Sequence, residues 1–263
     1  MFKTRLISGI VLVALALLTI ITGGWVLFFT TLALSLIGAG ELFAAMGVHE
    51  KGTVNLLELA GYLSIGLFYL SLRINYATFQ MAFLILGLVL IMAVYVFSYP
   101  RYHAHQVMAT FFAVIYVGVM LSYIYQCRLL GNGQIVVWLI FLASWGCDTC
   151  AYCAGMLLGK HKMAPVLSPK KSVEGAIGGV IGAVALGAIF AAIFGESIPG
   201  YMIICGVGAL ISMVGDLAAS AIKRNMQIKD YGKLIPGHGG VLDRFDSVIF
   251  IAPVIYYLAV FLG

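Results

Sequence analysis

The chain has 263 residues, of which 63% are apolar and only 10% carry a charge, and its formal net charge is +5. Soluble domains carry about a quarter charged residues, so this composition excludes an ordinary water-exposed surface. Inside a bilayer every backbone amide must be paired within the protein, which leaves helical bundles or closed barrels. The apolar runs reach roughly 20 residues, about twice the length of a barrel strand, and therefore indicate an all-α, polytopic membrane protein.

The first apolar segment follows two basic residues, Lys3 and Arg5, and runs from Leu6 to Ile21. This order resembles a signal peptide, but no small-x-small cleavage site follows, and a second apolar segment begins at Trp25. We interpret the first segment as a membrane helix. The sequence then predicts nine spans in all, at residues 6–22, 25–46, 54–72, 76–97, 105–127, 134–158, 173–195, 199–222 and 245–262.

The basic residues are divided unevenly between the two sides of this topology. If nine helices alternate, the N-terminus shares its side with the loops near residues 47–53, 98–104, 159–172 and 223–244. That side receives 13 of the 15 Lys and Arg residues, and only Arg73 and Arg128 fall on the other. Because cytoplasmic loops are enriched in Lys and Arg, we expect the N-terminus in the cytoplasm and Gly263 outside.

The chain divides by content into two parts of one membrane-embedded unit. Residues 1–132 supply N-terminal transmembrane helices. Residues 133–263 form the expected catalytic transmembrane region, whose longest polar loops, 159–172 and 223–244, fall on the cytoplasmic side. A charged substrate arriving from the cytoplasm would meet these two loops first.

Asp216 lies late in the eighth expected span. Ser220 and Lys223 follow at spacings of four and three residues, so the three side chains share one helical face. A carboxylate at membrane depth costs roughly 2.5–3.5 kcal/mol and normally lines a polar cavity. The alternative is a salt bridge from Asp216 to Lys223 or Arg224 near the interface.

Asp243 and Asp246 are three residues apart at the start of the last span, so a helical turn would direct both carboxylates the same way. Such a pair suits Mg²⁺, which binds a few carboxylates together with substrate phosphates. The alternative is helix capping by Asp243, with Asp246 placed favourably near the positive end of the helix. Both interpretations can hold together.

The segment 236–240, Pro-Gly-His-Gly-Gly, predicts a tight turn whose backbone N–H groups can approach an anion. Basic residues surround it in the sequence, namely Lys223, Arg224, Lys229, Lys233 and Arg244. Together with the acids at fixed spacing, this arrangement is typical of a site for metal-bound phosphate.

A second polar group begins with Asp148 inside the sixth span and continues in the following loop with Ser168, Lys170 and Lys171. An unpaired carboxylate in a membrane is expensive, so we expect Asp148 to belong to the same site. Ser168 and Ser172 can instead cap the seventh span, and the lysines can attract anionic lipid.

Two further acids, Glu41 and Glu58, lie within predicted spans, where they either pair with polar loops or line the cavity. The residues Cys147, Cys150 and Cys153 recur every three positions beside Asp148, and we interpret them as small packing residues.

The segment from Ser220 to Asp246 resembles, through all 27 residues and without a gap, the signature of the phosphatidate cytidylyltransferases, also called CDP-diacylglycerol synthases. Residues 148–152 and 168–175 resemble two further motifs of this family. Three positions depart from its usual residues: Cys150 and Lys171 stand where glycine is common, and Val173 replaces a frequent tryptophan.

The resemblance implies an enzyme of phospholipid biosynthesis that converts CTP and phosphatidate to CDP-diacylglycerol and pyrophosphate with Mg²⁺. It further implies the inner (plasma) membrane, an active site facing the cytoplasm and no nucleic-acid partner, and it is compatible with a homodimer. The metal ligands would be Asp216, Asp243, Asp246 and Asp148. The catalytic residues would be Asp216, Asp243, Asp246, Lys223 and Arg224. The substrate-binding residues would be Ser168, Lys170, Lys171, Ser220, Lys229, His238, Gly239, Gly240 and Arg244.

Two other classes stay open. A transporter or channel would relay ions through Asp148, Asp216 and Glu58, but it predicts broken helices in paired halves, and the sequence shows no such symmetry. Another lipid-phosphate enzyme, such as a CDP-alcohol phosphotransferase or a polyisoprenol kinase, is the second alternative. The former is expected to carry its own aspartate-rich helix motif, which this sequence lacks.

Overall fold

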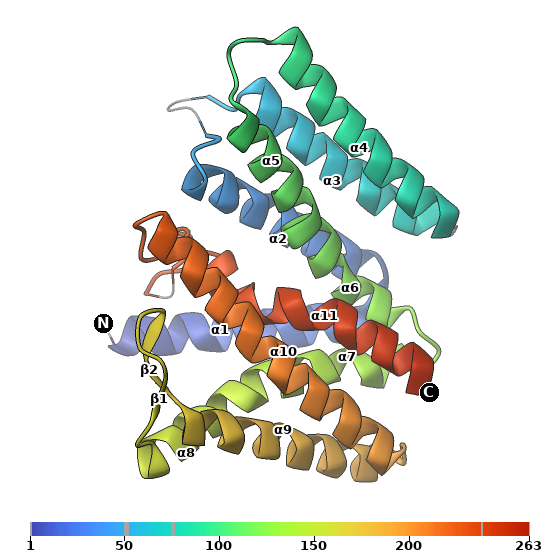
Figure 1. The fold of residues 1–263 in the computed structure, drawn as a ribbon. Helices are drawn as coiled ribbons and strands as arrows, with labels where there is room; N and C mark the ends of the chain where they lie inside the picture. Colours follow the sequence, from blue (N-terminus) through green and yellow to red (C-terminus); the bar gives the residue numbers. More distant parts are fainter. Residues whose placement is uncertain (1, 50–52, 75–76, 238, 263) are drawn as a thin grey trace. The chain divides into compact units, whose positions relative to one another are not determined.

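The computed structural model describes residues 2–49, 53–74, 77–237 and 239–262 (Figure 1). Its helical elements are α1 (Phe2–Thr22), α2 (Gly24–Ala45), α3 (Leu56–Ile74), α4 (Ala77–Phe97), α5 (Ala104–Ala113), η1 (Val114–Val119), α6 (Met120–Arg128), α7 (Gly133–Phe141), η2 (Leu142–Gly146), α8 (Cys147–Leu158), α9 (Val173–Phe194), α10 (Ile198–Asn225) and α11 (Leu242–Leu262). The elements η1 and η2 are π-helical turns within longer helices. Two short strands, β1 (Lys162–Ala164) and β2 (Ser168–Ser172), form an antiparallel hairpin where the sequence predicted only a loop.

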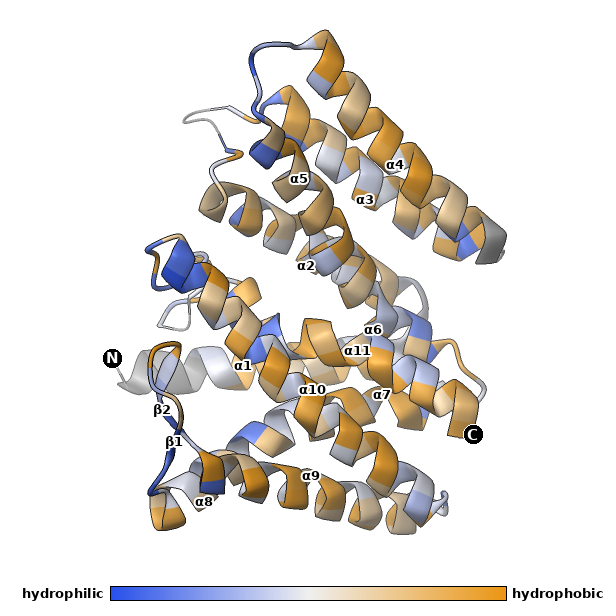
Figure 2. Cartoon of the chain, viewed as in Figure 1, coloured by the Kyte–Doolittle hydropathy of each residue, from blue (hydrophilic) through white to orange (hydrophobic). Residues whose placement is uncertain are grey.

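Eight helical stretches of the described residues are long and apolar enough to cross a membrane. They are Gly24–Ala45, Leu56–Ile74, Phe79–Phe97, Ala104–Arg128, Gly133–Leu158, Val173–Phe194, Ile198–Asn225 and Leu242–Leu262. Each corresponds to one expected span, and Figure 2 shows apolar residues along most of their length. The chain is therefore an all-α polytopic membrane protein. The apolar part of α1 that was searched, Ser8–Thr22, is shorter, so the count of nine spans and the orientation of the termini stay predictions.

The chain forms two compact units. The first unit contains Met1–Tyr125 and Ile228–Arg244, and the second contains Gln126–Gln227 and Phe245–Gly263. The division expected at residues 132 and 133 followed sequence content and stays a prediction. The segment Ile228–Arg244, called the signature loop below, ends in the first turn of α11. It belongs to the compact unit of the N-terminal helices although it carries most of the expected family signature.

In the first unit, α3 packs along α4 and against α2 (Figure 1). Gly61 of α3 allows this close approach, because a Cβ there would stand only 2.7 Å from the ring of Phe43. Tyr69 is fully buried, and its hydroxyl pairs at 2.8 Å with that of Ser35 on α2. Close helix contacts between small residues and one satisfied polar pair are typical of packing inside a membrane.

In the second unit, α9 packs on both α8 and α10. Gly178 and Gly182 of α9 lie directly on Ala154 and Cys150 of α8, where an added Cβ would overlap them. Cys147 is completely buried in the same contact region. The cysteines Cys147 and Cys150 therefore lie in helix packing, as the sequence predicted, whereas Cys153 is exposed. All five cysteines of the chain are free.

Candidate active site

The carboxylate of Asp216 on α10 forms an ion pair with the ammonium of Lys171 on β2. Both side chains are about one quarter exposed, at 27% and 26%. The pair joins a helix to the hairpin across 45 residues of sequence. The sequence offered Lys223 or Arg224 as the alternative partner of Asp216, and the family resemblance implied a substrate contact for Lys171, so neither prediction included this ion pair.

Two more carboxylates of the second unit lie within electrostatic range of Asp216. The charge of Asp246 on α11 interacts with those of Asp216, Asp148 and Lys223. The charge of Asp148 on α8 interacts with those of Asp216 and Lys171. We call Asp148, Asp216 and Asp246 the acidic cluster. Because like charges repel at short range, a group of this kind is stabilised by compensating cations or by protonation of one of its members.

A π-helical turn precedes the helix that carries Asp148. The turn η2 ends at Gly146, and Asp148 lies in the first turn of α8. Ser144 of η2 is fully buried, and its hydroxyl pairs at 2.7 Å with that of Ser247, the neighbour of Asp246. Single π-helical turns are frequent at functional sites because they change the direction of the side chains that follow. Here the turn η2 connects the helices that carry Asp148 and Asp246 through the hydrogen bond between Ser144 and Ser247.

The hairpin that presents Lys171 is fixed at its base. Glu174 on α9 accepts hydrogen bonds from the backbone N–H groups of Lys160 at 3.0 Å and of His161 at 3.2 Å. Ser172 caps α9 by accepting the N–H of Gly175 at 3.1 Å, as the sequence predicted for this serine. Ser168 instead pairs with Ala164 inside the hairpin and does not cap the helix.

Asp243 lies in the signature loop of the first unit and is only 6% exposed. Its Oδ2 accepts hydrogen bonds from the backbone N–H groups of Tyr231, at 2.8 Å, and Gly240, at 2.9 Å. Both donors precede α11, so these bonds shape the loop, and helix capping by Asp243 stays a prediction. The second bond also commits the N–H of Gly240, which was expected to approach phosphate, to a carboxylate of the protein itself.

The tight turn expected at residues 236–240 is present in the described part of the loop. Gly237 and Gly239 have positive φ angles of 77° and 88°, a conformation that glycine adopts without strain. Ile235 N–H donates to the carbonyl of Gly239 at 2.8 Å and closes the turn. His238 lies outside the described residues.

The other expected site residues are divided between the two units. Lys170 on β2 and Arg224 on α10 are exposed, and Ser220 and Lys223 of α10 are half-buried; all four belong to the second unit. Lys229 and Arg244 are exposed in the first unit. The structure thus brings Asp148, Asp216, Asp246, Lys171 and Lys223 together within one unit, and a metal ion shared between Asp216 and Asp243 stays a prediction.

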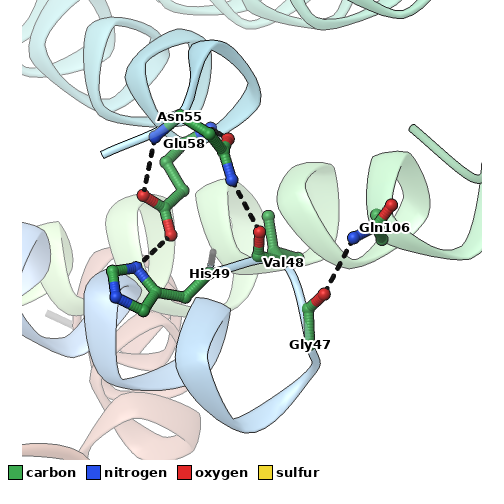
Figure 3. A network of polar contacts seen from close by, with 6 residues as sticks. All are labelled: Gly47, Val48, His49, Asn55, Glu58 and Gln106. Carbon is green, nitrogen blue, oxygen red and sulfur yellow. Dashed lines mark hydrogen bonds and ion pairs between the residues drawn. The ribbon is translucent and has the colours of Figure 1, made fainter. Parts of the chain in front are cut away.

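Glu58, which the sequence left unassigned, has a local structural role (Figure 3). It is 1% exposed, its Oε2 accepts the N–H of Asn55 at 3.2 Å, and its own N–H donates to Asn55 Oδ1 at 2.9 Å. This reciprocal capping box begins α3. The Oε1 of Glu58 also pairs with His49 Nδ1 at 2.7 Å. A carboxylate engaged in this way argues against the ion relay of the transporter alternative.

Glu41, the other unassigned acid, lies on α2. Its Oε1 and Oε2 accept the N–H groups of Val241, at 2.9 Å, and Leu242, at 2.8 Å. It therefore contacts the start of α11 from 200 residues away in sequence. Nothing in the surrounding sequence signals this contact, because both neighbours of Glu41 along the chain belong to an ordinary apolar helix.

The acidic cluster has the chemistry of a magnesium site but is not a complete cage. Among the described residues, no three His, Cys, Asp or Glu side chains are arranged to hold a metal ion by themselves. Mg²⁺ usually takes one or two protein carboxylates and completes its shell with water and substrate phosphates. The oxygen donors of Asp216 and Asp246 fit this preference, and a cation, the Lys171 ammonium, already lies against Asp216.

Known proteins resemble the chain over nearly its full length. Residues 3–262 match the model of a family described as the cytidylyltransferase family. The phosphatidate cytidylyltransferase of Staphylococcus saprophyticus is 30% identical over 98% of this chain and 99% of its own. That of Bacillus subtilis (strain 168) is 31% identical over 97% of both chains. That of Staphylococcus aureus (strain COL) is 31% identical over 98% of this chain and 99% of its own.

Proposed function

Because the chain belongs to the cytidylyltransferase family, we propose that it converts CTP and phosphatidate to CDP-diacylglycerol and pyrophosphate. The relatives that carry this activity in their names cover nearly the whole chain, which supports the choice of substrates. The structural observation behind the proposal is the acidic cluster with its lysine partner in the second unit. A group of three acids and two lysines in an otherwise apolar protein suits the handling of phosphate and a cation.

In the proposed reaction a phosphate oxygen of phosphatidate attacks the α-phosphorus of CTP. A new phosphorus–oxygen bond forms, the bond between the α-phosphorus and the bridging oxygen breaks, and its electron pair leaves with pyrophosphate. The attacking oxygen is already anionic, so the step requires no strong general base. The main barrier is the repulsion between two anions and the charge that develops on the leaving group, so catalysis depends on positioning and electrostatic stabilisation.

The residues of the second unit supply this stabilisation in the proposal. Lys171 and Lys223 neutralise phosphate charge, and the planar guanidinium of Arg224 donates two parallel hydrogen bonds to phosphate oxygens. Asp216 and Asp246, with Asp148 beside them, would hold Mg²⁺, which when bound neutralises the CTP phosphates and the leaving pyrophosphate. Lys171 would then exchange its contact with Asp216 for a contact with a phosphate.

The remaining expected residues complete the substrate sites. Lys229 and Arg244 of the signature loop would bind the phosphates of CTP. Ser168 and Lys170 of the hairpin, with Ser220 of α10, would contact the phosphatidate head group. Asp243 stays a candidate metal ligand, and its two backbone hydrogen bonds give it a role in shaping the loop as well.

The proposed reaction takes place at the cytoplasmic face of the plasma membrane. The acyl chains of phosphatidate stay in the bilayer while its head group meets a nucleotide dissolved in the cytoplasm. A multi-pass helical protein with its basic loops on the cytoplasmic side suits this task, and the charge asymmetry of the loops supports that orientation. A homodimer stays compatible with the proposal.

Incorporation of cytidine into lipid tests the proposed function. Membranes that contain the protein are incubated with Mg²⁺, phosphatidate and CTP labelled in the cytosine ring, and the lipids are extracted. We expect label in the lipid fraction only when phosphatidate is present, together with an equal amount of pyrophosphate.

The alternatives give different outcomes in the same assay. A transporter leaves the lipid unlabelled, a polyisoprenol kinase transfers phosphate without cytidine, and a CDP-alcohol phosphotransferase consumes CDP-diacylglycerol. Active preparations of one of the named relatives serve as the positive control. Lipid that stays free of cytidine under conditions in which that control is active would refute the proposal.

A further inference from the structure

Glu41 connects helix α2 to the beginning of α11. Its two carboxylate oxygens each accept one backbone hydrogen bond, from Val241 and Leu242, at 2.9 and 2.8 Å. The N–H groups at the start of a helix have no partner within the helix, and a side chain close in sequence usually caps them. Here the capping carboxylate comes from another helix of the same compact unit.

The signature loop is held at neighbouring points as well. Asp243 accepts the N–H groups of Tyr231 and Gly240, and the hydroxyl of Ser8 on α1 donates to the carbonyl of Pro236 at 3.1 Å. The three consecutive N–H groups of residues 240–242 are thus all bound by carboxylates of the protein. Two acids, one from within the loop and one from α2, fix the backbone here.

Two glycines of the signature loop pack directly against the carboxylate of Glu41. A Cβ added to Gly232 or to Gly240 would overlap the Oε1 atom of Glu41. Neither glycine has the positive φ angle that explains Gly237 and Gly239. The absence of a side chain at both positions is therefore explained by the space that the Glu41 carboxylate needs, and not by backbone conformation.

We infer that Glu41 is a positioning residue for CTP binding. Each of its two oxygens accepts a backbone N–H group of the loop, so we assign its role to the loop and not to contact with the nucleotide. It fixes the loop that carries Lys229 and Arg244, the residues assigned above to the CTP phosphates. This inference rests on the proposed function and adds to it a residue outside the segments that resemble the family motifs.

The first experiment compares Glu41→Gln with Glu58→Gln as a matched control. Both changes remove a charge from a carboxylate that accepts backbone N–H in the first unit. Glu58, however, accepts that of Asn55 at the start of α3 (Figure 3) and lies away from the signature loop in sequence. A hydrogen bond to a charged group is worth about 10- to 100-fold in an equilibrium constant. For Glu41→Gln we expect kcat/KM for CTP to fall by about 10- to 100-fold while KM for phosphatidate stays unchanged. Glu58→Gln lowers the melting temperature without this selectivity.

The second experiment is a double-mutant cycle that needs no activity. Thermal unfolding in detergent is measured for Gly240→Ala, for Glu41→Ala and for the two changes combined. In the presence of Glu41 the added methyl group overlaps its carboxylate, so Gly240→Ala lowers the melting temperature. In the Glu41→Ala background the space is free, and we expect the same change to have little further effect.

The outcomes separate the inference from the proposed function. If the wild-type protein makes no CDP-diacylglycerol, the proposed function is refuted, and so is the role of Glu41 in CTP binding. The thermal cycle then still decides whether Glu41 stabilises the signature loop. With active wild-type protein, unchanged kcat/KM for CTP in Glu41→Gln, or equal effects of Glu41→Gln and Glu58→Gln on both substrates, would overturn the inference. Additive effects in the thermal cycle would do the same.

Discussion

Lys171 is the residue that most changes how the site is understood. Its ammonium forms an ion pair with Asp216 and interacts electrostatically with Asp148. It therefore neutralises part of the negative charge of the acidic cluster when no substrate is bound. A lysine is well suited to this, because its flexible chain can move a compact charge from one anion to another. In the proposed reaction the same residue exchanges its contact with Asp216 for a contact with a phosphate.

Replacement of Lys171 by methionine tests this role. Lys171→Met keeps the length of the side chain and removes its charge, so phosphate loses one stabilising group. Loss of one such group costs about 10²–10³ in kcat in well-studied enzymes, and we expect a loss of that order here. The rate of CDP-diacylglycerol formation measures it, with Lys162→Met on β1 of the same hairpin as the control. Equal activity of the two variants would show that Lys171 has no part in the reaction.

At the scale of single residues, the sequence predicted which carboxylates lie together in the second unit better than it predicted their partners. Asp148, Asp216 and Asp246 were each expected at the site, because a carboxylate within an apolar span is costly wherever it occurs. The contacts between Lys171 and Asp216, and between Glu41 and residues 241–242, were not predicted. Both join segments far apart in sequence, and such pairings depend on tertiary structure that no local pattern records.

Helices α8 and α9 are the elements whose contact supports the acidic cluster. Glycines on one face of α9 lie directly against α8, whose first turn carries Asp148. Without hydrophobic driving force in lipid, helices of this kind associate through close contact between small residues. The separation of these two helices therefore sets the position of Asp148 relative to the hairpin and α10.

Matched glycine substitutions test this contact. A methyl group at Gly182 would overlap Cys150, so Gly182→Ala should destabilise the protein by about 1–3 kcal/mol and reduce activity. Gly66 of α3 has no atom within 4 Å of an added Cβ, so Gly66→Ala should be neutral or stabilise by up to about 1 kcal/mol. Thermal unfolding in detergent compares the two. Equal melting temperatures would contradict the described packing of α9 on α8.

At the scale of elements, apolar length predicted the spans closely. The expected segments 25–46 and 173–195 correspond to Gly24–Ala45 and Val173–Phe194, because burial in lipid requires a long apolar run whatever the partners are. The π-helical turns η1 and η2 and the β1–β2 hairpin were not predicted. Each depends on a local rearrangement of hydrogen bonds, which changes neither composition nor hydropathy.

For the whole molecule, the division of basic residues between the loops predicts the orientation of the chain in the membrane. With nine spans, the N-terminus lies in the cytoplasm and the C-terminus outside, and 13 of 15 Lys and Arg residues face the cytoplasm. With eight spans the two termini would lie on the same side. Whether residues 8–22, the apolar part of α1, cross the membrane thus decides between the two topologies.

Reporter fusions to the C-terminus test this orientation. Alkaline phosphatase is active only outside the cytoplasm, whereas green fluorescent protein exported as an unfolded chain does not fluoresce. We expect an active phosphatase fusion and a dark fluorescent fusion at the C-terminus. A fluorescent fusion without phosphatase activity would place the C-terminus in the cytoplasm and reject the nine-span topology.

The central claim is that the acidic cluster holds the cation that lets CTP and phosphatidate react. The most direct measurement is the initial rate of CDP-diacylglycerol formation as a function of free Mg²⁺, for the wild type, Asp216→Asn, Asp246→Asn and a Glu196→Gln control. We predict that Glu196→Gln follows the wild type, that Asp246→Asn needs at least about tenfold more Mg²⁺ for half-maximal rate, and that Asp216→Asn loses about 10³ of the rate. Wild-type Mg²⁺ dependence and rate in both aspartate variants would contradict the account.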